Sequence, residues 1–160
     1  MKFKVLKFII IPIIIALLAV NFAWIMHVRS FNKFFDEKFE HLHGNTSHID
    51  RTGDVLYGAY TPEYLRFHGN FSCNSKDGTF KILLWPTFMC RDIKRIGMIL
   101  QDSKGSAHHV YVDKNLNYSA DLNEGITQEE YEIVRAIMAE KQTEIAELYS
   151  MMRERFNFEW

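Results

Sequence analysis

Residues 8–26 read FIIIPIIIALLAVNFAWIM, an uncharged stretch that follows Lys2, Lys4 and Lys7. As an α-helix, this stretch would extend for about 28 Å, which matches a hydrocarbon layer roughly 30 Å thick. A helix is the only single segment that satisfies its own backbone amides in lipid. The stretch therefore predicts a transmembrane anchor over residues 8–28, preceded by a cytoplasmic basic stub at residues 1–7.

A cleaved signal peptide has the same order of a basic start and an apolar segment. Its apolar core is usually about 7–15 residues long and is followed by small residues at the cleavage site. Here the apolar stretch is longer, and the segment from Asn21 to Ile25 contains no A-x-A pattern. These two features favour a retained single-pass anchor, with cleavage as the alternative.

The charges that flank the stretch indicate its orientation through their density. Three lysines lie within the first seven residues, whereas Arg29, Lys33 and Lys38 on the other side alternate with acidic residues. The denser positive charge favours a cytoplasmic N-terminus. The only two cysteines, Cys73 and Cys90, suggest one disulfide of the kind found in small exported domains. We therefore expect a protein of the bacterial inner (cytoplasmic) membrane whose C-terminal domain lies in the periplasm or outside the cell.

The chain beyond residue 30 is mildly acidic, with 15 Lys and Arg against 20 Asp and Glu. Because it also contains no basic run, a nucleic-acid partner is not expected. About 130 residues are enough for one compact domain but not for two. The abundant aromatic residues, 13 Phe, 7 Tyr and 3 Trp, predict a well-packed core.

Three segments are expected beyond the anchor. An apolar stripe at helical spacing predicts an amphipathic juxtamembrane helix over residues 29–43; it consists of Phe31, Phe34, Phe35, Phe39 and Leu42. Residues 44–54 are polar, contain two glycines and are expected to be a linker. Residues 55–160 are expected to form an extracytoplasmic α+β domain.

Short apolar segments between turn signals predict an antiparallel β-meander in this domain. The expected strands cover residues 55–60, 79–85, 95–102 and 107–113. Thr61 and Pro62 have the pattern of a helix N-cap followed by the first helical position. They predict a short helix that extends to Phe67.

A capping box and a hydrophobic staple predict the start of a long C-terminal helix; they consist of Thr127 and Glu130, and of Ile126 and Tyr131. The helix should extend toward Phe156. Its apolar stripe could form a coiled-coil seam, but Lys141 and Arg155 at seam positions favour packing across the sheet. The predicted fold is therefore α+β, with an N-terminal transmembrane helix followed by a small antiparallel β-meander packed against a long C-terminal helix.

Two groups of residues have side chains that bind metals. Three histidines that could bind zinc lie beyond the anchor: His41, His43 and His48. On the predicted helix, however, His41 and His43 face different directions, which favours ordinary surface positions. Oxygen-bearing side chains also follow the spacing of an EF-hand calcium loop: Asp113, Asn115, Asn117, Asp121 and Glu124. Because Tyr118 occupies the loop position that requires glycine, a simple β-turn at Asp113–Asn115 is favoured over a calcium site.

No nucleophile or phosphate-binding motif of the common types (G-x-S-x-G, S-x-x-K, H-E-x-x-H or a P-loop) occurs in the chain. We therefore expect a non-enzymatic interaction protein without a cofactor, held in the lipid bilayer and bound to another envelope protein. It would be an accessory subunit of an envelope complex, or an inhibitor or immunity factor. The aromatic side chains expected at its partner site are Tyr57, Tyr60 and Tyr64. The alternatives are a metal- or ligand-sensing domain that uses zinc or calcium, and a small envelope hydrolase.

Overall fold

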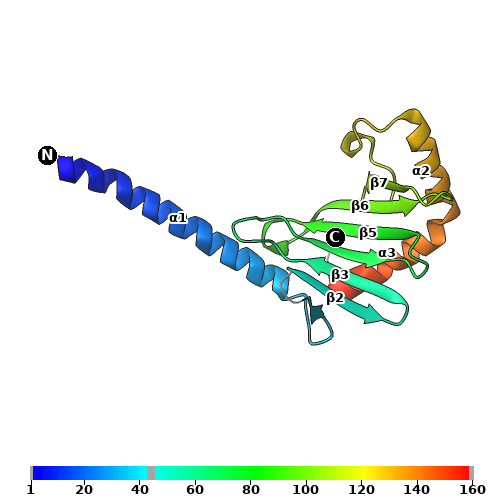
Figure 1. Cartoon of the computed structure of the whole chain (residues 1–160), viewed down its shortest axis with the longest axis horizontal. Helices are drawn as coiled ribbons and strands as arrows, with labels where there is room; N and C mark the ends of the chain where they lie inside the picture. The colour runs from blue at the N-terminus through cyan, green and yellow to red at the C-terminus, as the bar shows by residue number, and fades with distance from the viewer. Residues whose placement is uncertain (1, 43–45, 159–160) are drawn as a thin grey trace.

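The computed structural model describes residues 2–42 and 46–158, and its fold is α+β (Figure 1). An N-terminal helix, α1 (Lys2–Asn32), is followed by one antiparallel sheet in which each strand pairs with the next strand of the chain. The strands are β1 (Glu40–His41), β2 (Ser47–Thr52), β3 (Val55–Tyr60), β4 (Asn70–Asn74), β5 (Phe80–Pro86), β6 (Ile93–Gln101) and β7 (Ala107–Val112). Two single-turn 3-10 helices, η1 (Phe88–Cys90) and η2 (Ala120–Leu122), and the helices α2 (Gln128–Glu140) and α3 (Gln142–Phe156) complete the fold. The predicted α+β class and antiparallel meander are confirmed.

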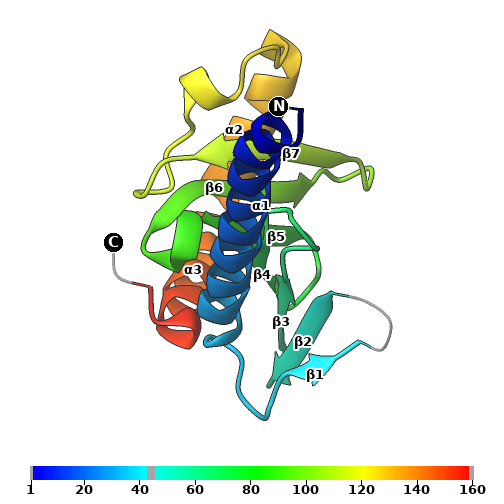
Figure 2. The ribbon, with the colours of Figure 1, turned by 90° about the vertical axis from the view of Figure 1, so that its left-hand side faces the viewer.

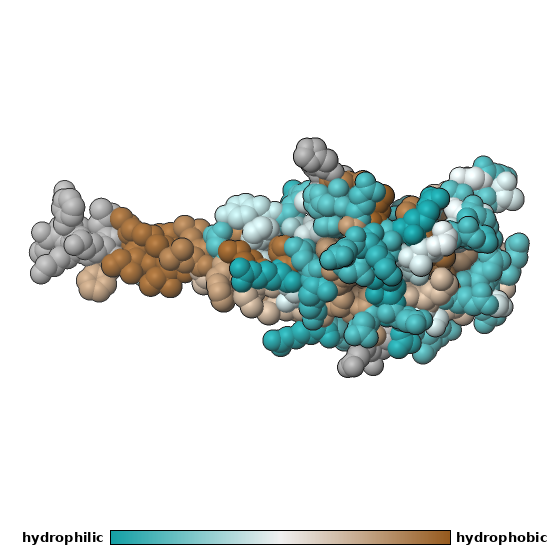
Figure 3. Space-filling view, turned by 90° about the horizontal axis from the view of Figure 1, so that it is seen from below, coloured by the Kyte–Doolittle hydropathy of each residue, from teal (hydrophilic) through white to brown (hydrophobic). Residues whose placement is uncertain are grey.

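Helix α1 projects from the domain as a nearly free rod (Figures 1 and 3). Every side chain from Phe8 to Val20 is exposed, and the most apolar 18-residue window within Phe8–Asn32 has a mean hydropathy of 2.7. Among the described residues, it is the one helix long and apolar enough to cross a membrane. In Figure 3 the apolar rod contrasts with the largely hydrophilic surface of the domain.

The juxtamembrane helix predicted over residues 29–43 is wrong beyond Asn32, where α1 ends. The chain turns instead, because the phenylalanines that would share one helical face pack around the end of the sheet. Phe31 stacks on Phe71 with 4.4 Å between ring centroids, and Phe39 lies against Phe156. Arg155 stabilises the turn with hydrogen bonds of 3.2 Å to the carboxylate of Asp36.

The linker predicted over residues 44–54 instead contains β2, which pairs with both β1 and β3. Its polar side chains hid the strand, since only Asp50 of β2 is buried. Arg155 reaches that carboxylate at 3.1 Å and so compensates for its burial. Residues 44 and 45 lie outside the described residues.

The short helix predicted over residues 61–67 is also wrong. This segment is a loop with one turn, in which the Arg66 amide donates to the Glu63 carbonyl at 2.9 Å. The indole of Trp24 donates to the same carbonyl at 2.8 Å. In a helix, that carbonyl would accept from the amide of Phe67 instead. A contact with α1 therefore replaces the helical hydrogen bond.

The predicted capping box is present, because the Glu130 amide donates to Thr127 Oγ1 at 3.2 Å. The single long helix expected after it is divided at Lys141 into α2 and α3. The Lys141 amine extends to Asp77 at 3.2 Å and lies 5.9 Å from the ring centroid of Phe80. Helix α3 packs on the sheet, as expected.

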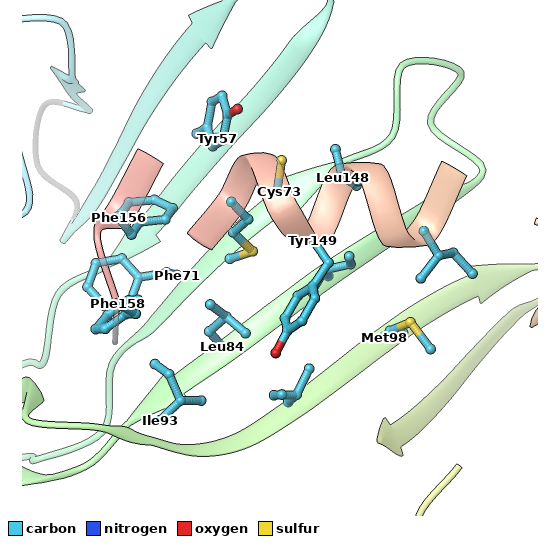
Figure 4. Close-up of a cluster of buried hydrophobic side chains, with 14 of the residues drawn as sticks. Tyr57, Phe71, Cys73, Leu84, Ile93, Met98, Leu148, Tyr149, Phe156 and Phe158 are labelled. Carbon is cyan, nitrogen blue, oxygen red and sulfur yellow. The ribbon is translucent and has the colours of Figure 1, made fainter. Parts of the chain in front are cut away.

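The core lies between α3 and one face of the sheet (Figure 4). Strands β4 to β6 contribute Phe71, Cys73, Leu84 and Met98, and α3 contributes Leu148, Tyr149 and Phe156. Burial of these side chains is what holds α3 in place, since the helix itself has no side-chain cap at its N-terminus.

The turn between β4 and β5 contains a carboxylate, Asp77, that should make the free energy of unfolding fall at acidic pH. The amide and hydroxyl of Thr79, together with Ser75 and Lys141, donate to Asp77 and hold the pKa of that carboxyl well below its usual range. Unfolding releases the carboxyl to an ordinary pKa of about 3.9. The stabilisation is therefore present above that pH and is lost as the pH falls toward the depressed native value.

Asp77→Asn should accordingly lower the urea midpoint at neutral pH and reduce its further fall on acidification. The measurement is urea unfolding of the detergent-solubilised chain, followed by tryptophan fluorescence at neutral pH and below the usual aspartate pKa. Asp121→Asn, on an exposed side chain, is the matched control. An acid dependence of Asp77→Asn as steep as that of the wild type would contradict the assignment.

Candidate functional site

The disulfide predicted between Cys73 and Cys90 is not formed, and both residues are buried free thiols. Cys73 pairs with Ile82 in the middle of the sheet, whereas Cys90 follows the end of β5 at Pro86. Pro86 lies four residues beyond Ile82, the partner of Cys73, and four residues along a strand span about 13 Å. A disulfide requires Cα atoms within about 7 Å of each other. Burial raises the pKa of both thiols to about 12, which makes them inert. The cysteines therefore give no support to an oxidising compartment.

Two of the three predicted zinc ligands meet across a hairpin. His41 and His48 are paired residues of β1 and β2, with 4.5 Å between ring centroids. His48 also stacks on Phe35 at 4.2 Å, and its burial, followed by the proximity of His41, lowers its pKa. His43 lies outside the described residues. Within residues 2–42 and 46–158, no group of three or more His, Cys, Asp or Glu side chains could hold a metal ion.

The predicted calcium loop begins as a tight turn. Asp113 Oδ1 accepts the backbone amides of Asn115 and Asn117, both at 2.8 Å, and Oδ2 accepts the Asn117 side chain at 3.0 Å. The hydrogen bonds from Asn117 and Asn115 hold the pKa of Asp113 below its usual value. The carboxylate thus closes the β-turn that was the favoured alternative.

The second half of the same loop is held by a different residue. The side chain of Asn123 bonds to both the amide and the carbonyl of Tyr111 at 2.8 Å, whereas Asp121 and Glu124 are exposed. The described structure does not bring these carboxylates together with Asp113 as a group of metal ligands.

The three tyrosines predicted for partner binding occupy different environments. Tyr57 is buried, with only 3% of its surface exposed, and packs edge-on against Phe156, so its assignment to an exposed site is wrong. Tyr60 is half-buried, and its hydroxyl donates to Glu63. Tyr64 is 64% exposed, and its hydroxyl donates to Asn21 Oδ1 of α1 at 2.6 Å.

The end of α1 docks onto the domain along one helical face. Trp24, His27 and Phe31 lie three and four residues apart and so point in the same direction. The Met89 amide donates to His27 Nδ1 at 2.9 Å, and both His27 and Phe31 are fully buried. The two loops that receive α1, residues 61–69 and 87–92, flank the helix when it is viewed along its axis (Figure 2). The apolar rod is therefore joined to the domain by packed side chains and not by a linker.

One glycine permits this docking. A Cβ atom at Gly69 would lie 2.6 Å from Phe31 Cε2 and 2.7 Å from the carbonyl oxygen of Tyr60. Neither neighbour can move freely, since Phe31 is stacked on Phe71 and the carbonyl belongs to the backbone. Gly69 is therefore required for the close approach of α1 to the sheet.

The face of the sheet opposite α3 carries half-buried apolar side chains on four strands: Leu56, Leu83, Trp85, Ile99 and Tyr111. In the described part of the chain, α3 lies on the other face, where its buried residues belong to the core (Figure 2). The half-buried side chains lie among polar residues of the same face, such as Lys81 and His109, which pair with Ile99. We call this surface the open sheet face.

The open sheet face ends in an aromatic and basic pocket. Trp85 lies 5.8 Å from Tyr111, and the Arg95 guanidinium is 5.6 Å from the Tyr111 ring centroid. These residues and Lys94 line a pocket of about 330 Å³ beside the loop of residues 61–69. A cation beside two aromatic rings can bind an anionic or aromatic group.

Sequence reasoning missed both surfaces, although each has a recognisable signal. The strand TFKILLW is apolar at alternate positions on both faces, since Ile82 and Leu84 enter the core while Leu83 and Trp85 do not. The docking face of α1 has the helical spacing of Trp24, His27 and Phe31.

Comparison with known proteins does not assign the chain to a family. No protein-family model matches it, and searches of curated proteins and of solved structures return no significant match.

Gly69→Ala should detach the end of α1 from the sheet. We expect a loss of about 1–3 kcal/mol in unfolding free energy, because a methyl group must be accommodated in a fully packed contact. Limited proteolysis should also become faster in the turn at residues 33–38. A suitable control is Gly78→Asn, because an added side chain there meets nothing within 4 Å and asparagine tolerates the positive φ. Wild-type stability and proteolysis of Gly69→Ala would contradict the docking role.

Proposed function

We propose that this protein is a non-enzymatic, membrane-anchored interaction protein of the bacterial inner membrane, with its domain on the extracytoplasmic side. The open sheet face would hold another envelope protein, so that the chain serves as an accessory subunit, or as an inhibitor or immunity factor. The observation that carries the proposal is a sheet face with half-buried aliphatic and aromatic side chains that no helix in the described part of the chain covers, on a domain fixed to the end of an apolar helix.

The open sheet face supports the proposal through its composition. An antiparallel sheet with one solvated face normally alternates apolar and polar residues, so that the outer face is polar. Here Leu83 and Ile99 occupy outer positions on the neighbouring strands β5 and β6, and Trp85 and Tyr111 flank them. Aromatic residues together with arginine are enriched at the centres of protein interfaces.

The attachment of α1 supports the same function. A domain on a flexible linker would sample many heights and orientations above a membrane. Packing of Trp24, His27 and Phe31 instead presents the open sheet face in one orientation relative to the helix. Such preorganisation reduces the entropic cost of binding a partner in the same membrane.

The orientation follows from the lysines before the apolar stretch. Lys2, Lys4 and Lys7 lie within seven residues, which favours retention of the N-terminus in the cytoplasm. The domain would then face the extracytoplasmic side.

The test is site-specific photo-crosslinking of the full-length chain in intact cells. A photoreactive phenylalanine analogue at Leu83 or at Ile99 should give one discrete adduct of the same partner mass. The same analogue at Glu147, which is exposed on α3, is the matched control and should not give that adduct. Introducing Ile99→Glu should abolish the adduct formed from Leu83 while leaving the membrane-extracted amount of the protein unchanged.

Identical adducts from Leu83 and Glu147 would show that crosslinking reports only proximity in the membrane, and would contradict a specific interface. A lack of adducts from both Leu83 and Ile99 would also overturn the proposed binding face.

A further inference from the structure

The domain contacts α1 at a position along the helix that would bring part of the domain to the lipid. The uncharged part of α1 that stands free of the domain, Phe8 to Val20, contains thirteen residues and extends for about 20 Å, which is shorter than a hydrocarbon layer roughly 30 Å thick. The apolar stretch reaches sufficient length only when it continues to Met26. Yet the domain already contacts the helix at Asn21, about 7.5 Å before that point.

We infer that the end of the domain around α1 is itself a lipid-contacting surface, in which the tips of the loops at residues 61–69 and 87–92 enter the interfacial layer of the membrane. We call this surface the collar. The inference rests on the proposed membrane anchor and adds a second contact with the same bilayer. Both loops flank α1 in the view along its axis (Figure 2).

The side chains at the loop tips have the chemistry of an interfacial layer. Outside α1, five large hydrophobic side chains of the described domain are exposed, and three of them belong to the collar: Tyr64, Leu65 and Phe88. They are 64%, 41% and 50% exposed. Tyrosine and tryptophan prefer the level of the lipid headgroups, where one end of the ring is apolar and the other is wet. Trp24 lies against Tyr64 with 5.1 Å between ring centroids and so extends this aromatic belt.

The charges around the collar favour anionic headgroups. The collar itself contains Arg66 and Arg91 against Glu63 and Asp92. Four further exposed basic residues lie close to it at the end of α1 and at the start of β6: Arg29, Lys33, Lys94 and Arg95. The chain beyond residue 30 is acidic as a whole, so a local group of basic residues near α1 departs from its average composition. Basic residues next to a membrane are attracted to an anionic lipid surface.

A lipid bilayer is the occupant that fits this surface, because the collar is continuous with a helix of transmembrane length. A protein bound to the collar would have to displace lipid from around α1. Tyr64 contacts α1 at Asn21 and Trp24, and Phe88 contacts it at His27. The basic residues Arg29 and Lys33 follow these positions along the chain, in the order in which a bilayer presents acyl chains and headgroups.

Depth-dependent fluorescence quenching tests the inference. A bimane label is placed on Leu65→Cys or Phe88→Cys in the full-length protein, reconstituted into vesicles of phosphatidylethanolamine and phosphatidylglycerol. The native thiols are buried with pKa values of about 12, so the introduced cysteine is labelled selectively. Ser103→Cys, in the exposed turn after β6 at the other end of the sheet, is the soluble control. Leu18→Cys, within the free part of α1, is the inserted control.

Lipids brominated near the headgroup should quench the labels at positions 65 and 88 several-fold more strongly than the label at position 103. If position 18 is quenched while positions 65 and 88 resemble position 103, the anchor is inserted and the collar inference is overturned. If position 18 is also unquenched, the membrane anchor of the proposed function fails, and the collar inference fails with it.

Discussion

The stack of Phe31 on Phe71, made possible by Gly69, is the contact on which the arrangement of the molecule depends. It joins the last turn of α1, whose segment Phe8–Val20 is exposed, to the hydrophobic core, because Phe71 also packs against Phe156 of α3. The helix, the sheet and the C-terminal helix therefore meet at one aromatic residue of β4. Core aromatic contacts of this kind combine large buried area with a defined geometry, so they fix orientation as well as stability.

This contact also explains why the region after the anchor does not continue as a helix. A helix extended to Leu42 would carry Phe34, Phe35 and Phe39 away from Phe71 and leave their surface in water. The turn at residues 33–38 keeps these rings within the cluster, and Arg155 links the turn to Asp36 and to the buried Asp50. Removal of apolar surface from water thus outweighs the modest helical propensity of a short amphipathic segment.

The parts of the fold that could be predicted from sequence are those with local signals. The apolar strands β3, β5, β6 and β7 and the capping box at Thr127 follow from periodicity and from hydrogen bonds between near neighbours. The errors occur where distant residues decide the outcome. Glu63 accepts a hydrogen bond from Trp24, which lies 39 positions away, and β2 is held in the sheet by its neighbours despite its polar sequence. The candidate surfaces were missed for the same reason. Leu83 and Trp85 lie on an outer face only because α3 packs on the opposite face of the sheet.

The chain has two apolar surfaces that its own helices do not cover: the open sheet face and the free part of α1. Helix α3 packs on only one face of the sheet, and the buried side chains of α1 pack on the loops at the end of the sheet. Neither helix therefore covers Leu83 and Ile99 on the other face. The free part of α1 is directed away from the sheet and does not cover this face either (Figure 1). The free part of α1 belongs to a helix long enough for a lipid layer, whereas the open sheet face includes the aromatic residues Trp85 and Tyr111. The two surfaces therefore suit two different environments. A bilayer would cover the free part of α1, and the proposed protein partner would cover the open sheet face.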